Sequence, residues 1–124
     1  MRRAVVLENP SPEAFDALFA SHRYVVVDFY ATWCVPCRSY TPKFQRAYRE
    51  LRRRRPDVAF EFVSVDVDRD HALARAHRVR SVPTTVVLAE ARGWFGRRRR
   101  VATARWSGDK AWPDLLRTLE DALG

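Results

Sequence analysis

Cysteine is scarce in this sequence, with two residues among 124. That number excludes the class of small secreted scaffolds that depend on several disulfide bonds. Long apolar runs are also missing, and the best candidate, Tyr24 to Ala31, is interrupted by Asp28. A membrane-spanning helix needs roughly 18 consecutive apolar residues, so none is expected. The apolar stretch Ala4 to Leu7 is too short for the core of a signal peptide, which favours a cytoplasmic protein.

Acidic residues are outnumbered, since 15 Asp and Glu stand against 23 Lys and Arg. The formal net charge of +8 strengthens the long-range attraction to acidic partners or nucleic acid. A hydrophobic fraction of 47% is enough for one core and excludes a disordered acidic tail. The sequence shows neither an internal repeat nor a linker. We therefore expect a single domain over residues 1–124, and we expect it to be monomeric.

The apolar pattern predicts an α/β domain whose mixed central sheet carries helices on both faces. The segment Tyr24 to Tyr30 is apolar on both sides, which is typical of a central strand covered by helices. Ser11 can cap the first helix, and Pro12 suits its first turn. After a short apolar stretch at 4–8, the predicted helices cover residues 12–21, 34–55, 72–77 and 107–123, and the predicted strands cover 24–30, 58–67, 84–88 and 100–105.

The motif Cys34-Val35-Pro36-Cys37 follows the central strand directly and opens a predicted helix. A cysteine at a helix N-terminus faces free backbone N–H groups and the positive end of the helix dipole, which favour the thiolate. Cys37 lies one turn along, close enough to attack a mixed disulfide formed at Cys34. Pro36 stiffens the first turn, and Trp33 offers an apolar lid beside the thiolate. The pattern therefore predicts dithiol–disulfide chemistry.

Two other uses of the cysteine pair have to be weighed. A zinc site needs four ligands, and His71 with His77 could complete a Cys2His2 set. The long stretch between the two pairs contains a whole predicted strand, which disfavours this site, so no metal is expected. A purely structural disulfide would stabilise little, because the loop that it closes is very short.

The segment Val27 to Arg38 resembles the active-site segment of the thioredoxin family. Pro42 stands where that family kinks its second helix, and Ser81-Val82-Pro83-Thr84 resembles the family's cis-proline segment. With the β-β-α ending, the resemblance covers essentially the whole chain. It implies a thioredoxin fold and a protein-disulfide reductase that serves electron transport and cell redox homeostasis.

The resemblance also implies a role for individual residues. Cys34 is expected to be the exposed nucleophile, Cys37 the buried resolving thiol, and Asp28 the buried carboxylate that handles the Cys37 proton. The backbone of Val82, before a cis Pro83, is expected to pair with the substrate chain. The expected substrate-binding residues are Trp33, Val35, Pro36, Val82 and Pro83.

The redox-active disulfide Cys34–Cys37 is the only redox group expected, because the sequence has no nicotinamide or flavin fingerprint. Electrons are therefore expected from a donor of the thioredoxin-reductase type, and the substrates are expected to be proteins with disulfide bonds.

Four departures from the family pattern bear on these expectations. Tyr30 stands where tryptophan is usual, and Val35 where glycine is usual. The stretch Glu61 to Asp66 lacks the lysine that often lies near the buried acid, so the Asp28 carboxyl is expected to hold its proton more strongly. The glycine of the substrate groove is expected to be replaced by Ala104 or Arg105.

Two arginine clusters, Arg52–Arg55 and Arg97–Arg100, are expected at the pole opposite the cysteines. They can be solvated charges at a helix end and a hairpin tip. They can also form a docking patch for nucleic acid, an acidic protein or an anionic membrane, since Trp94 and Phe95 lie beside the second cluster. Two alternative functions remain: a thioredoxin-fold oxidase or isomerase, and a binding module that docks acidic partners through this arginine-rich pole.

Overall fold

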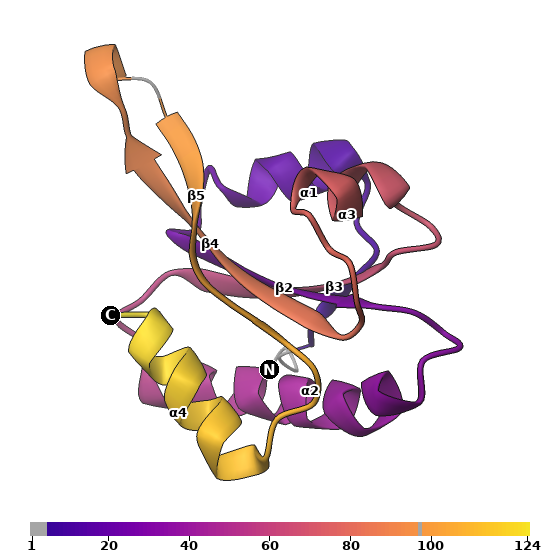
Figure 1. The fold of residues 1–124 in the computed structure, drawn as a ribbon. Coiled ribbons are helices and arrows are strands. Elements are labelled where there is room, and N and C mark those ends of the chain that lie inside the picture. Colours follow the sequence, from indigo (N-terminus) through magenta and orange to yellow (C-terminus); the bar gives the residue numbers. More distant parts are fainter. Residues whose placement is uncertain (1–4, 97) are drawn as a thin grey trace.

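The computed structural model describes residues 5–96 and 98–124. At its centre lies a five-stranded sheet in the order β1-β3-β2-β4-β5 (Figure 1). The strands are β1 (Leu7–Glu8), β2 (Tyr24–Tyr30), β3 (Phe60–Asp66), β4 (Thr84–Arg92) and β5 (Arg98–Ser107). β3 runs parallel to both β1 and β2, whereas β4 runs antiparallel to β2 and to β5. The predicted mixed sheet is confirmed.

Helices cover both faces of the sheet, as expected. They are α1 (Pro12–Leu18), α2 (Val35–Arg54), α3 (His71–Ala76) and α4 (Trp112–Ala122). In Figure 1, α1 and α3 lie on one face and α2 with α4 on the other. The chain is therefore an α/β domain of three layers.

The alternation of side chains along β2 supplies both layers of core. Val25, Val27 and Phe29 are fully buried and pack with Phe15 of α1 and with Phe19, the residue that follows this helix. Neighbouring side chains on a strand point to opposite faces, so the residues between them meet α2 and α4. The core on that face contains the buried side chains of Val26, Tyr40, Phe44, Ala47, Tyr48, Leu51, Phe62, Leu115 and Leu119.

Two helices, α1 and α2, begin at the capping residues that the sequence predicted. The Ala14 N–H donates to Ser11 Oγ at 3.1 Å, with Pro12 as the first residue of α1. Cys34 caps α2, which contains Pro42 inside it. An N-cap side chain satisfies a backbone donor that the helix itself leaves unpaired.

The structure corrects the bounds of the final helix and of the last two strands. The final helix begins at Trp112 and not at residue 107, because Gly108 has a φ of +89°, outside the range of a right-handed helix. The last two strands are longer than predicted and pair as far as Arg92 with Arg98. Antiparallel backbone pairing accounts for the extra length of these strands, since an arginine-rich segment has no strong β-propensity of its own.

Candidate active site

Cys34 and Cys37 are joined by a disulfide bond across the first turn of α2, with their Cα atoms 5.3 Å apart. Cys34 is the N-cap residue, and the Cys37 N–H donates to its Sγ at 3.2 Å. After reduction, this N–H and the positive end of the α2 dipole both favour a thiolate at Cys34. The geometry thus gives one of the two sulfurs the surroundings of a nucleophile.

The expectation of an exposed Cys34 is wrong for the disulfide form. Cys34 is 4% exposed and Cys37 is 3% exposed, so burial does not distinguish them. Both pack with Ala31, and Val67 and Val82 close over this small cluster. Strands and loops that are distant in the sequence bring these apolar groups together, so the motif alone could not predict that the disulfide is buried.

The exposed surface around the disulfide comes from its sequence neighbours. Trp33 is 66% exposed and Val35 is 69% exposed, and Pro36 is exposed as well. Trp33 Nε1–H donates to Asp68 Oδ2 at 2.9 Å, which orients the indole ring. Asp68 was not predicted from the sequence, because it lies in the loop after β3 and the motif gives no sign of it.

A second loop faces the disulfide. The Val82–Pro83 peptide bond is cis, as predicted, and the Val82 carbonyl oxygen lies 3.5 Å from Cys34 Sγ. Val82 is half-buried and Pro83 is buried. The structure therefore brings Trp33, Val35, Val82 and the two cysteines to one place, as the sequence analysis expected.

Gly108 lies against this loop, so the predicted loss of the groove glycine is wrong. Its N–H donates to the Pro83 carbonyl oxygen at 2.7 Å, and no heavy atom lies within 4 Å of the position of an added Cβ. Arg105 does not line the groove, since its guanidinium donates to the carbonyls of His77 and Arg78. The signal in the sequence was the Ser-Gly-Asp turn before α4, which had been predicted to belong to the helix.

Asp28 occupies the face of β2 that α2 covers. It is wholly buried, and among the described residues neither carboxylate oxygen has a hydrogen-bond partner. Burial raises its pKa from the ordinary 3.8 to about 7. A buried carboxyl with a pKa near neutrality can take up and release a proton at the pH of a cell.

A hydroxyl pair that the sequence analysis missed lies beside Asp28. Thr85 is the cross-strand neighbour of Asp28 on β4, and its Oγ1 lies 2.6 Å from Tyr40 Oη. Trp106 Nε1–H donates to the same Tyr40 oxygen at 3.2 Å. Burial raises the pKa of Tyr40, and the negative charge of Asp28 adds to the increase. Tyr40 follows Cys37 by three residues on the buried face of α2, so cysteines, carboxyl and hydroxyls share one side of the sheet.

The other residues that the sequence analysis weighed lie apart from this cluster. His77 packs its ring against Phe29, with centroids 5.9 Å apart, on the opposite face of the sheet. Within 5–96 and 98–124, no group of three His, Cys, Asp or Glu is placed to hold a metal ion. The same part of the chain contains no helix that is both long and apolar enough to cross a membrane.

Arg52–Arg55, and Arg98–Arg100 of the second cluster, lie at the end of the sheet opposite the cysteines, where β2 begins (Figure 1). They do not form one patch. Arg54 bonds to Glu120 of α4 at 3.4 Å, whereas Arg100 bonds to Asp16 of α1 at 2.6 Å on the other face. Arg97 lies outside the described residues.

Comparison with known proteins connects this site to a family. The family model of thioredoxin matches residues 6–101. The thioredoxin of Mycoplasma genitalium is 37% identical over 84 residues, covering 68% of this chain and 76% of that protein. Protein disulfide isomerase-like 1-4 of Arabidopsis thaliana is 31% identical over 112 residues, covering 87% of this chain but 18% of the relative.

Solved structures agree on the fold. The thioredoxin of Malassezia sympodialis has a TM-score of 0.74 at 23% identity, with 100% of this chain and 96% of that chain covered. The thioredoxin of Fasciola hepatica has a TM-score of 0.65 at 28% identity, with 94% and 99% covered. A Cys-x-x-Cys disulfide at the start of α2 in such a chain is the site of a thiol–disulfide oxidoreductase. The chain belongs to the thioredoxin family.

Proposed function

We propose that this oxidoreductase works as a reductase of protein disulfides. In the reduced protein, the Cys34 thiolate attacks one sulfur of a substrate disulfide. That bond breaks, the departing sulfur takes up a proton, and a mixed disulfide joins Cys34 to the substrate. The observation that carries the proposal is the placement of the Cys34–Cys37 pair at the α2 N-terminus. On the strand beneath it lies a buried carboxyl that has no hydrogen-bond partner among the described residues.

Resolution of the mixed disulfide needs a second thiolate. Cys37 passes its proton to the Asp28 carboxylate and attacks Cys34 Sγ, which releases the reduced substrate and leaves Cys34–Cys37 oxidised. The raised pKa of Asp28, about 7, suits a group that accepts this proton and later returns it to water. A donor of the thioredoxin-reductase type then returns two electrons to the disulfide, and no further cofactor takes part.

The surface around the disulfide selects the substrate. An extended substrate segment pairs with the backbone of Val82 beside Pro83, in the manner of an added strand. Trp33, Val35 and Pro36 contact its side chains on the other side of the sulfurs. Such reduction belongs in a reducing compartment, and we propose the cytoplasm, with the protein acting as a monomer.

The test is turnover of a disulfide substrate with matched variants. Cys34→Ser is expected to abolish insulin reduction, and Cys37→Ser to accumulate a mixed disulfide that mass spectrometry detects. Asp28→Asn is expected to slow the resolving step at least about tenfold while the first attack keeps its rate. Exposed Asp121→Asn serves as the control. Equal rates of resolution in the Asp28→Asn and control proteins would contradict the role of Asp28.

The redox potential separates a reductase from an oxidase or isomerase. Equilibration against glutathione should give a value below about −250 mV, close to the thioredoxin range. A value above about −180 mV would place the protein with the oxidants and isomerases and overturn the reductase proposal.

A further inference from the structure

The β4–β5 hairpin extends beyond the rest of the sheet. Pairing of β2 with β4 stops at Tyr24 with Ala89, whereas β4 and β5 continue to pair for three further positions. The 3-10 turn Trp94–Gly96 closes the hairpin. In Figure 1 this two-stranded ribbon stands out from the body of the domain, on the side away from the start of α2.

The hairpin tip, Gly93 to Gly96, presents two aromatic side chains to solvent. Trp94 is 88% exposed and Phe95 is 99% exposed, more than any other large apolar side chain of the described residues. Their ring centroids are 6.5 Å apart. Phe95 has a φ of +63°, a conformation that a bulky residue rarely adopts. Because burying two such rings is favourable, their joint exposure marks a surface that docks onto something else.

Positive charge lies beside the tip. Arg98, Arg99 and Arg100 follow it on β5, and all three are exposed. Arg98 and Arg99 line an open hollow together with Trp94 and Phe95. The carboxylate of Glu90 lies 3.9 Å from Arg98, a distance at which an exposed pair contributes little.

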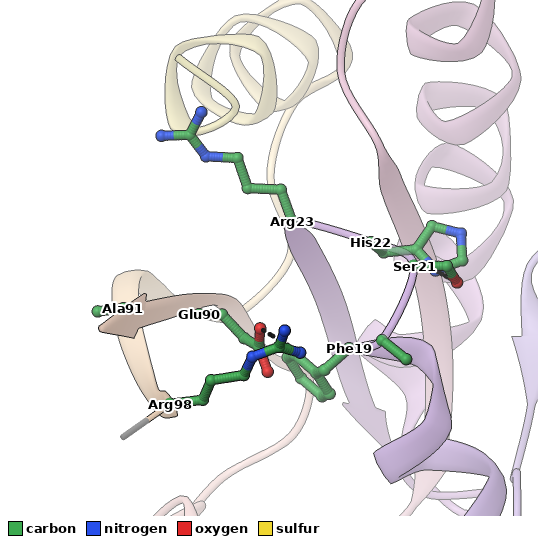
Figure 2. A pocket seen from close by; sticks show the side chains of 8 residues that line it. Phe19, Ser21, His22, Arg23, Glu90, Ala91 and Arg98 are labelled. Carbon is green, nitrogen blue, oxygen red and sulfur yellow. Dashed lines mark hydrogen bonds and ion pairs between the residues drawn. The ribbon is translucent and has the colours of Figure 1, made fainter. Parts of the chain in front are cut away.

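Side chains near the base of the hairpin contact the body of the domain. Figure 2 shows Arg98 turned back towards Glu90, beside the ring of Phe19, in a pocket of about 350 Å³. Arg100 holds Asp16 of α1 at 2.6 Å. At the tip, the rings of Trp94 and Phe95 stay uncovered by the described residues. The aromatic pair is therefore accessible to a partner.

We propose that the hairpin tip docks onto a bilayer rich in anionic phospholipid. In a bilayer the phosphates lie outermost and the hydrocarbon lies beneath them. The hairpin has the matching order, because the two aromatic rings lie farthest out and the arginines follow behind them. Trp and Phe enter the interfacial region, while guanidinium groups stay at the phosphates.

The shape of the tip disfavours a nucleic acid. Proteins that bind single strands place aromatic platforms inside a basic groove that follows the phosphate backbone. Here the aromatic groups lie on a projecting point. The hollow beside them is open and is lined by five described residues of the hairpin, so it does not continue along the domain as a basic groove. Docking at this point would turn the Cys34–Cys37 end of the domain away from the membrane, towards protein substrates.

Vesicle binding of the intact oxidised protein tests the proposal. The protein is expected to sediment with vesicles of phosphatidylglycerol and phosphatidylcholine in equal parts, and not with phosphatidylcholine alone. The double variant Trp94→Ser/Phe95→Ser should weaken binding at least about tenfold. Arg98→Ser/Arg99→Ser should weaken it about 30-fold, from about fivefold for each arginine near an anionic surface. Bromine-labelled lipid is expected to quench Trp94 fluorescence.

Arg53→Ser/Arg54→Ser is the matched control, since it removes two charges from the end of α2 and leaves the hairpin intact. It should lower binding less than the hairpin arginine pair does. The tip substitutions affect exposed residues, so unchanged circular dichroism is expected to verify folding. No sedimentation with anionic vesicles would overturn the proposal. So would equal losses in the two arginine variants, or tip-dependent binding to a single-stranded oligonucleotide in the absence of vesicle binding.

Discussion

The buried carboxyl of Asp28 makes the stability of the protein depend on pH in a calculable way. Its pKa is about 7 in the folded protein, against 3.8 for an ordinary aspartate such as that of the unfolded chain. Between these values the folded protein holds a proton that the unfolded chain has lost. The free energy of unfolding therefore falls as pH rises through this window and levels off above pH 7.

Replacing Asp28 by Asn removes this dependence, because the amide does not ionise. One pKa unit corresponds to about 1.4 kcal/mol, so the full difference of about three units amounts to about 4 kcal/mol above neutrality. Between pH 5 and pH 8, the wild-type free energy of unfolding falls only as far as pH 7, over two pH units, which amounts to about 3 kcal/mol. The stability of Asp28→Asn relative to the wild type should therefore increase by about 3 kcal/mol between pH 5 and pH 8.

The assay is urea unfolding of both oxidised proteins at pH 5 and pH 8, followed by tryptophan fluorescence. Keeping the disulfide intact prevents the thiols from contributing, and the three histidines are common to both proteins. Exposed Asp121→Asn should reproduce the wild-type profile. Parallel pH profiles for wild type and Asp28→Asn would refute the reasoning, because they would mean that the carboxyl ionises in the folded protein as readily as in water.

Three further substitutions test other parts of the structure, each by urea unfolding at neutral pH. Tyr40→Phe should cost about 1 to 3 kcal/mol, because it leaves the buried Thr85 hydroxyl without its partner; unchanged stability would show that the hydroxyl pair contributes nothing. Gly108→Ala should cost about 1 to 2 kcal/mol from backbone strain at a φ of +89°, since space for the methyl group is available. Ser11→Ala should cost about 1 kcal/mol by removing the cap of α1, and a loss below a few tenths would contradict that role.

Local patterns in the sequence predicted the parts of the molecule that depend on neighbouring residues. The bounds of the central strand, Tyr24–Tyr30, were predicted correctly, because apolar residues on both faces of so short a run favour a buried strand. Cys34 was correctly placed at the start of a helix, and the cis bond before Pro83 was predicted from its motif. The membership in a family followed from the same local segments.

Features that depend on register and packing could not be predicted in this way. Antiparallel pairing places Thr85 beside Asp28, and only the docking of α2 brings Tyr40 to them. Packing of Val67 and Val82 decides that Cys34 is buried in its disulfide form.

The difference between the features that could be predicted from the sequence and those that could not has a physical reason. Residue type and spacing along the chain determine which groups can react, cap a helix or form a strand, because these properties act over a few neighbouring residues. The burial of Asp28, its lack of a hydrogen-bond partner among the described residues and the reach of the β4–β5 hairpin arise from contacts between segments far apart in the sequence. Residue type and spacing were enough to predict the chemistry of the cysteine pair, whereas tertiary contacts create the surroundings in which that chemistry takes place.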